Sequence, residues 1–347
     1  MMDPRAFVRW AGALGWAAVL ATVICSLLLQ GNRELQAFAV PPQQLLTGLP
    51  SPILFQGNRT TAYRDPAAAY HDGWFYLFFT LTKIEPTNEV FEYTAWSKSR
   101  DLVQWTKPKI FTPRNSSLNY SSPGNIIRFA GKWVLCLQTY PRPHGEKYGD
   151  KHARIWIMRS DDLEHWGPPE LLHVKGPDVP VKNMGRMIDP FLLQDKDDPG
   201  KWWVFYKQKG MSRSWSRDLE HWTFAGATSA GENTCILVTG NEYVLFDSPE
   251  NGIEERRSTN LSHWRKVAFI TLGQRQWPWA RGRLTAGFVL DARQLPGVGK
   301  YLMFFHGSPY AEDDPRGGFD NLASIGLAWS NDLQEWHWPG EKDSNKR

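Results

Sequence analysis

Cysteine is scarce in this chain of 347 residues, which contains only Cys25, Cys136 and Cys235. The three are far apart in sequence and none forms a C-x-x-C pair, so neither a disulfide framework nor a cysteine metal site is predicted. We expect Cys136 and Cys235 to be buried, reduced packing residues.

An excess of one charge is also missing. Lys and Arg number 40 against 36 Asp and Glu, a formal net charge of +4. This balance is too small and too evenly spread to indicate a nucleic-acid partner. The chain contains no phosphate-binding glycine loop, no H-E-x-x-H zinc motif and no G-x-S-x-G nucleophile motif. Nucleotide-dependent, zinc-peptidase and serine-hydrolase chemistry are therefore not encoded by these motifs.

Long apolar runs are absent apart from residues 10–29, which carry no charge and follow Arg5 and Arg9. Twenty apolar residues in a helix just cross a bilayer core. Residues 1–30 are therefore predicted to form either a signal peptide or an uncleaved signal-anchor helix. In both cases the arginines favour export of the remainder, with membrane contact only through residues 10–29.

Three further regions follow this N-terminal segment. Residues 31–50 contain three prolines and are predicted to be a linker. Residues 51–339 are predicted to form one domain, and residues 340–347 a polar tail. No other break in composition divides the chain.

Aromatic residues are abundant, with 18 Trp, 18 Phe and 11 Tyr. Five of the tryptophans end copies of a repeated pattern, Ser-x-Asp-Leu-x-x-Trp, whose fourth copy has Asn260 in place of Asp. We interpret the repeat as structural: the Asp side chain closes a turn, and Leu and Trp pack between units. The copies span residues 99–105, 160–166, 216–222, 258–264 and 330–336.

Between the copies the chain has short aromatic and β-branched segments that follow glycine turns at Gly73, Gly131, Gly200, Gly240 and Gly299. Such segments are typical of strands, and no helical period of 3.6 recurs. Four strands per unit and five units predict an all-β fold, a five-bladed β-propeller.

Three acidic residues precede these glycine turns in the first, third and fourth units. They are Asp65 in Arg64-Asp65-Pro66, Asp189 before Pro190, and Glu232. Aligned on the turns, they occupy matched positions at the start of the innermost strands and converge on one mouth of the central channel. Massed carboxylates raise one another's pKa, as a proton donor near neutral pH requires, so we interpret all three as catalytic.

These motifs resemble the five-bladed propellers of glycoside hydrolase family 43 and its relatives, families 32 and 68. The resemblance implies that Asp65 is the general base of an inverting enzyme or the nucleophile of a retaining one. It implies that Asp189 tunes a pKa and orients the substrate, and that Glu232 is the general acid. The similar segments are residues 64–66 with 72–79, residues 188–190 with 202–206, and Glu232 with residues 240–246.

Five further residues are predicted to bind substrate: Arg64, Trp74, Arg186, Arg283 and His306. The resemblance implies no required cofactor and no catalytic metal. A histidine at the corresponding position helps to hold a central cation in some arabinan-degrading members, which leaves a structural cation near His306 open.

The sequence thus predicts a glycosidase for an oligo- or polysaccharide, cleaving an arabinofuranoside, β-xyloside or related linkage with inversion. Two alternatives remain open. One is a retaining fructosidase or transglycosylase-type relative, and the other is a non-catalytic propeller that binds glycans.

Overall fold

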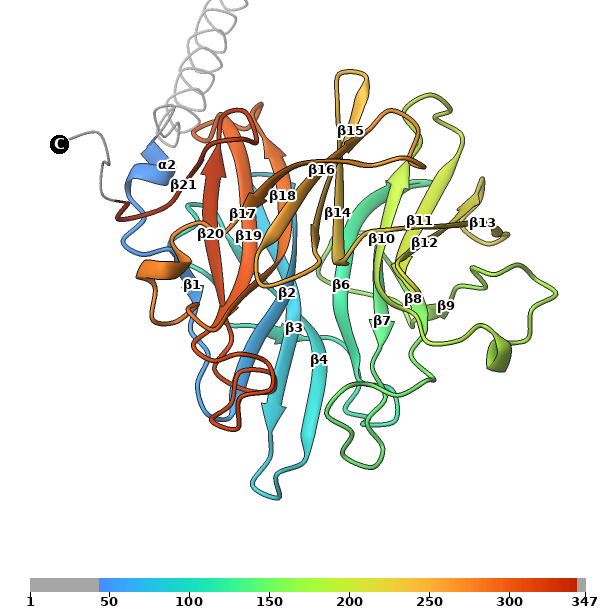
Figure 1. The fold of residues 1–347 in the computed structure, drawn as a ribbon, viewed down its shortest axis with the longest axis horizontal. Helices are drawn as coiled ribbons and strands as arrows, with labels where there is room; N and C mark the ends of the chain where they lie inside the picture. Colours follow the sequence, from blue (N-terminus) through green and yellow to red (C-terminus); the bar gives the residue numbers. More distant parts are fainter. Residues whose placement is uncertain (1–43, 342–347) are drawn as a thin grey trace, which may run out of the picture.

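Five antiparallel sheets surround a central channel in the computed structural model, which describes residues 44–341 (Figure 1). The predicted all-β, five-bladed propeller is confirmed. The predicted signal or anchor segment, residues 1–30, lies outside the described residues. Within residues 44–341 no helix is long and apolar enough to cross a membrane.

Each of the first four blades is a four-stranded sheet whose strands follow one another in chain order. Consecutive antiparallel strands need only short turns, so each blade is one continuous piece of sequence.

The bounds of the strands are as follows. Blade I comprises β2 (Thr61–His71), β3 (Trp74–Ile84), β4 (Val90–Ser99) and β5 (Lys109–Ile110). Blade II comprises β6 (Tyr120–Phe129), β7 (Lys132–Thr139), β8 (Ile155–Ser160) and β9 (Glu170–Leu171). Blade III comprises β10 (Ile188–Gln194), β11 (Trp202–Lys207), β12 (Met211–Ser216) and β13 (Thr223–Thr228). Blade IV comprises β14 (Glu232–Thr239), β15 (Glu242–Ser248), β16 (Ile253–Ser258) and β17 (Arg265–Ile270). Short 3₁₀ helices, η1 (Val181–Asn183) and η2 (Gln274–Gln276), precede blades III and V.

Blade V joins strands from both ends of the described chain. Its inner strands are β18 (Arg283–Ala292), β19 (Lys300–Ser308) and β20 (Ser324–Ser330). The outer edge of β20 pairs with β1 (Ile53–Phe55) and with β21 (Trp336–His337). Pairing β1 with β20 closes the ring between the first and last blades, which the repeat pattern did not predict.

The predicted linker is too long at its C-terminal end. Helix α2 (Gln44–Thr47) lies against the propeller, and Leu46 and Leu49 are buried in its main apolar core. The spacing of these leucines places both on one side of the segment. The interpretation of residues 31–50 relied on their prolines and overlooked this apolar pair.

The five repeats form the same turn. The serine hydroxyl accepts the N–H of the following leucine, seen in copies two to five, and the Asp or Asn oxygen accepts two further N–H groups. Each leucine is buried and has a left-handed backbone, with φ between 61° and 72°. The predicted side-chain closure of the turn is confirmed.

The motif tryptophans are less uniform. In four copies the indole N–H donates to the carbonyl of the motif leucine. In the fourth copy the guanidinium of Arg213 donates to the Leu261 carbonyl instead, and the Trp264 N–H has no partner among the described residues. Trp222 and Trp336 are buried, whereas the other three motif tryptophans are half-buried.

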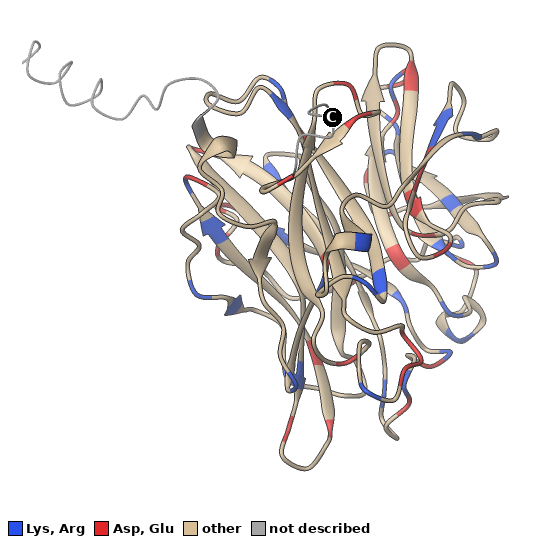
Figure 2. Ribbon diagram, turned by 60° about the vertical axis from the view of Figure 1, so that its left-hand side comes forward, with Lys and Arg blue, Asp and Glu red and all other residues tan. Residues whose placement is uncertain are grey.

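The glycine turns and the repeats lie at one end of the channel. The innermost strand of each blade begins at the other end. At that second end, long loops of residues 140–154 and 309–323 extend beyond the sheets (lower edge of Figure 1, green and red), while α2 lies at the opposite end. Lys, Arg, Asp and Glu residues lie mostly in loops and near strand ends, and most of the strand ribbon carries other residues (Figure 2).

Candidate active site

The innermost strand of every blade starts with the same irregularity. One residue has a left-handed backbone and is the first residue of a β-bulge, across which the pairing with the next strand shifts. Non-glycine residues adopt this backbone at a cost, and bulges re-aim side chains near functional sites. The five residues are Asp65, Ser122, Asp189, Asn233 and Ala286, with φ of 50°, 44°, 53°, 56° and 54°.

This register corrects the alignment of the three acids. Asp65 and Asp189 occupy equivalent positions, but the equivalent residue in blade IV is Asn233. Glu232 pairs with Ser248 and is the last paired residue before the bulge of blade IV. Arg64 occupies the same position before the bulge of blade I. Alignment on the glycine turns missed this offset because counting residues does not reveal where a bulge falls.

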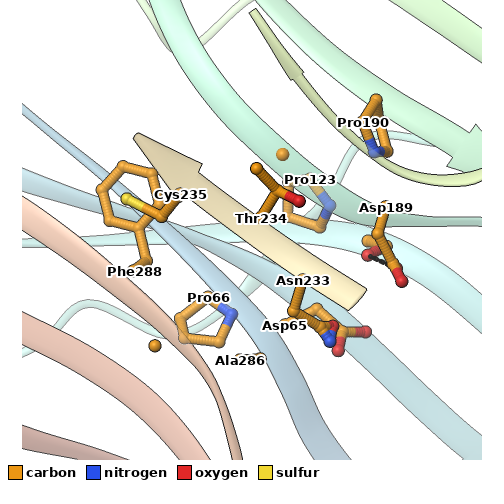
Figure 3. Close-up of a pocket in the computed structure, with 13 residues that line it drawn as sticks. Asp65, Pro66, Pro123, Asp189, Pro190, Asn233, Thr234, Cys235, Ala286 and Phe288 are labelled. Atoms are coloured by element: carbon orange, nitrogen blue, oxygen red, sulfur yellow. Dashed lines mark hydrogen bonds between the residues drawn. The ribbon is translucent and has the colours of Figure 1, made fainter. Parts of the chain in front are cut away.

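Despite the offset, Asp65, Asp189 and Glu232 line one pocket at the mouth of the channel, with a volume of about 580 Å³. Below it the channel narrows to a space of about 20 Å³, bordered by Asp65, Asp189 and Asn233 and by prolines of three blades (Figure 3). That lower space holds about one water molecule. The predicted convergence of the three carboxyls is therefore seen in the structure.

Asp65 is held on two sides. The hydroxyl of Thr80 donates to its Oδ2 at 2.8 Å, and its own backbone N–H donates to Nδ1 of His306 at 3.1 Å. Within residues 44–341, no N–H or O–H group donates to Oδ1 of Asp65. This oxygen is thus available to a water molecule or a sugar hydroxyl.

Asp189 is the most enclosed of the three. Its Oδ1 accepts the Ser122 hydroxyl at 3.0 Å, and its backbone N–H donates to Oε1 of Gln138 at 2.6 Å. Burial, together with the negative charges of Glu232 and Asp65, raises its pKa from 3.8 to about 7. Near neutral pH this group of carboxyls therefore retains a proton.

Glu232 faces two cations across the pocket. Oε2 contacts the ammonium group of Lys207, and Oε1 lies 3.5 Å from Nη2 of Arg283. Arg283 also pairs with Glu312 at 2.7 Å. These contacts hold the Glu232 side chain at the pocket wall, beside Asp189.

Comparison with known proteins agrees with this geometry. The family model described as glycosyl hydrolases family 43 matches residues 59–217, which include Asp65 and Asp189. The chain is a family 43-like five-bladed propeller. The match places it among the hydrolases of O-glycosyl bonds. No curated protein matches the sequence significantly.

Solved structures share the fold of this family 43-like propeller at low identity. A thermostable family-43 glycoside hydrolase is 13% identical with a TM-score of 0.56, covering 84% of this chain and 96% of its own. The catalytic domain of a Coprinopsis cinerea GH62 α-L-arabinofuranosidase is 16% identical (TM-score 0.54; 81% and 98% covered). A family 117 glycoside hydrolase from the marine bacterium Zobellia galactanivorans is 17% identical (TM-score 0.56; 78% and 85% covered).

Four of the five predicted substrate-binding residues of the propeller line the pocket, namely Arg64, Arg186, Arg283 and His306. Trp74 does not line the pocket, so its predicted role gains no support from the pocket geometry. It pairs with His71 beside the glycine turn at the far end of the channel, six residues along β2 from Asp65. Its ring lies under the cationic groups of Lys98 and Arg100.

His306 is buried, and its Nδ1 accepts the Asp65 N–H, so a neutral ring carries its proton on Nε2. Burial and the positive charges of Arg283 and Arg64 hold its pKa well below the usual value. Among residues 44–341 no group of three or more His, Cys, Asp or Glu is placed to hold a metal ion.

Several pocket residues were missed by the sequence analysis. Lys207 and Thr80, which bonds Asp65 from behind the pocket, lie on second strands whose nearly continuous buried runs give no sign of which residue meets a neighbouring blade. Glu92 of β4 is fully buried and pairs with Arg64 at 2.7 Å, and burial raises its pKa. Tyr148 and Phe319 come from the long loops of blades II and V and contact each other in an edge-to-face arrangement. Loops carry no repeat signal, so only the fold brings these residues to the site.

Proposed function

We propose that this propeller hydrolyses a furanoside or related linkage, such as an arabinofuranoside or β-xyloside, in an oligo- or polysaccharide, with inversion at the anomeric carbon. The observation that carries the proposal is the convergence of Asp65, Asp189 and Glu232 on one pocket at the channel mouth. Similarity of fold to a family-43 glycoside hydrolase and to an α-L-arabinofuranosidase supports the choice of linkage.

Asp65 is proposed as the general base. An inverting hydrolase needs a carboxylate that removes a proton from the attacking water on the face opposite the leaving group. The hydroxyl of Thr80 donates to Oδ2 of Asp65, and the backbone N–H of Asp65 donates to His306. These two hydrogen bonds fix the orientation of Asp65 and leave its Oδ1 for that water. A base in a fixed position avoids the cost of reorientation during the reaction.

Glu232 is proposed as the general acid that protonates the leaving oxygen, and Asp189 as the residue that governs its proton. Because the pKa of Asp189 is about 7, the three carboxyl groups of Asp65, Asp189 and Glu232 together keep a proton close to neutral pH. A proton held there is what protonation of a poor leaving group requires. Lys207 and Arg283 orient Glu232 toward the pocket.

Hydrolysis of a panel of nitrophenyl glycosides by the wild type and two variants tests these roles. Glu232→Gln should lower turnover of a 4-nitrophenyl substrate by about 10²–10⁴. A 2,4-dinitrophenyl leaving group needs little protonation, so it should restore most of the rate in Glu232→Gln but not in Asp65→Asn. Glu250, an exposed glutamate in a neighbouring loop, supplies the matched control Glu250→Gln, which should retain full activity.

The anomer formed first, followed by proton NMR, tests inversion. Early formation of the inverted anomer supports Asp65 as base. Net retention would instead make Asp65 the nucleophile of a retaining enzyme. Equal rates for Glu232→Gln and the wild type on every substrate would contradict the assignment of the acid.

We also propose that the propeller works outside the cytoplasm, exported by residues 1–30 and either released or anchored there. The support is the uncharged run 10–29 preceded by Arg5 and Arg9. Expression of the full chain, followed by alkaline extraction of membranes, separates the cases. Recovery of uncleaved protein in the cytosol would contradict export.

A further inference from the structure

A second depression continues from the pocket along blade III. It has a volume of about 680 Å³ and shares Arg186 and Lys207 with the pocket wall. Its other walls are the segment before β10 and the turn between β11 and β12, which contribute Lys175 and Lys209. We call this depression the basic groove, defined by Lys175, Arg186, Lys207 and Lys209.

Charges in the pocket are balanced, but those in the basic groove are not. Arg64 pairs with Glu92, Arg283 with Glu312, and Lys207 with Glu232. In contrast, no Asp or Glu lines the groove. Among the described residues Lys175, Arg186 and Lys209 form no ion pair with a carboxylate. Within residues 44–341, the one hydrogen bond from the Arg186 guanidinium runs from Nε to the Gly149 carbonyl at 3.0 Å, and its central carbon lies 5.5 Å from the ring centre of Tyr140. Its terminal nitrogens can therefore donate to a ligand.

Hydrogen bonds between its two walls hold the basic groove in shape. Gln208 donates to the carbonyls of Met184 and Arg186 at 2.9 and 3.0 Å, and this ties the two walls together. The Lys175 ammonium lies 3.6 Å from the ring centre of Phe224, which is 43% exposed. Burial and the nearby charge of Lys209 lower the pKa of Lys175, so the groove keeps like charges close together. A bound anion would relieve that repulsion.

We propose that the basic groove binds an anionic stretch of the glycan whose bond is cleaved in the pocket, so that the substrate is an acidic polysaccharide carrying carboxylate or sulfate groups. The inference rests on the proposed glycosidase function. It adds that sugars beyond the scissile bond continue over Arg186 toward Lys175 and Lys209. Guanidinium and ammonium groups are the usual partners of both kinds of anion.

Binding of matched charged and neutral probes to the full chain, carrying Asp65→Asn to prevent turnover, tests the proposal. One pair is oligogalacturonide and its methyl ester, and the other is a sulfated galactan oligosaccharide and its desulfated form. At low salt the charged member of at least one pair should bind about tenfold more tightly than its neutral partner, and the difference should shrink at high salt. The pair that shows it identifies carboxylate or sulfate as the anion.

Variants then locate the effect. Lys175→Gln combined with Lys209→Gln should weaken binding of the charged probe about tenfold, since exposed charge pairs contribute modestly each. Lys107 is exposed, lies outside the groove and forms no ion pair among the described residues, so Lys107→Gln should leave binding unchanged. Equal affinity for charged and neutral members in both pairs, or unchanged binding in the double variant, overturns the proposal. Turnover of neutral nitrophenyl glycosides is measured separately, so a failure of the glycosidase proposal is distinguishable from a failure of this one.

Discussion

The hydroxyl of Thr80 donates a hydrogen bond of 2.8 Å to Oδ2 of Asp65. The same oxygen of Thr80 accepts the backbone N–H of Ser122 at 2.7 Å, and the Ser122 hydroxyl donates to Asp189 at 3.0 Å. A short chain of hydrogen bonds thus runs from the first blade to the third and fixes two carboxyls of the pocket relative to each other.

Thr80→Val should remove the donor to Asp65 and also leave the Ser122 N–H without its acceptor. Because Thr80 positions the base rather than touching the substrate, kcat should fall by roughly tenfold or more while KM changes little. Thr80→Ser keeps the hydroxyl and should restore most of kcat. A loss that Thr80→Ser does not rescue would indicate a packing effect and contradict the positioning role.

Asp189→Asn should stabilise the protein at alkaline pH while reducing activity. The pKa of Asp189 rises from 3.8 to about 7 on folding, so the folded state binds more protons than the unfolded state between those values. Stability from this group is therefore lost as pH rises from about 4 to 7, by about 4 kcal/mol at most. Asn carries no charge and escapes this cost.

Thermal unfolding followed by tryptophan fluorescence at pH 4 and pH 8 measures the difference. The variant should unfold at a higher temperature than the wild type at pH 8, and the two should converge at pH 4. Asp178→Asn, at an exposed aspartate, is the control and should show no such pH dependence. A variant less stable than the wild type at pH 8 would contradict the raised pKa.

Asn260→Asp should stabilise the fourth repeat. Asn260 Oδ1 already accepts the N–H of His263 at 3.1 Å, but it has no charge to offer the imidazole ring. In the third repeat Asp218 contacts the ring of His221 at 2.8 Å and raises its pKa. The new carboxylate should stabilise the folded state through the same kind of contact, which a higher midpoint of urea unfolding would show. Asp218→Asn should lower the midpoint, and no change in either variant would contradict the argument.

Removal of residues 1–50 should lower the stability of the propeller more than removal of residues 1–43 does. The longer deletion takes away Leu46 and Leu49, which are 5% and 8% exposed. Burial of each leucine contributes about 1.5–3 kcal/mol. Urea unfolding of the two truncations measures the difference, and Leu46→Ala with Leu49→Ala in the full chain should reproduce it. Equal midpoints for the two truncations would show that α2 does not stabilise the fold.

The sequence by itself determined the number of blades and the turn that follows the third strand of each blade. Ser, Asp and Leu at fixed spacing specify that turn through contacts within seven residues, so the repeat is visible without any tertiary information. The acidic residues Asp65 and Asp189 were also recognisable, because each stands directly before a proline at the start of an inner strand.

Only the tertiary structure decided which residues share the pocket and in what register. The bulge after Glu232 places it level with Arg64 rather than with Asp65, and a bulge is set by pairing with the neighbouring strand. Trp74 was predicted to bind substrate, yet it begins β3 after the turn that ends β2, at the far end of the channel from Asp65. Lys207 meets Glu232 from another blade, and Lys175 with Lys209 extends the site beyond it. These relationships depend on distances between segments far apart in sequence, which closure of the ring determines and local spacing does not encode.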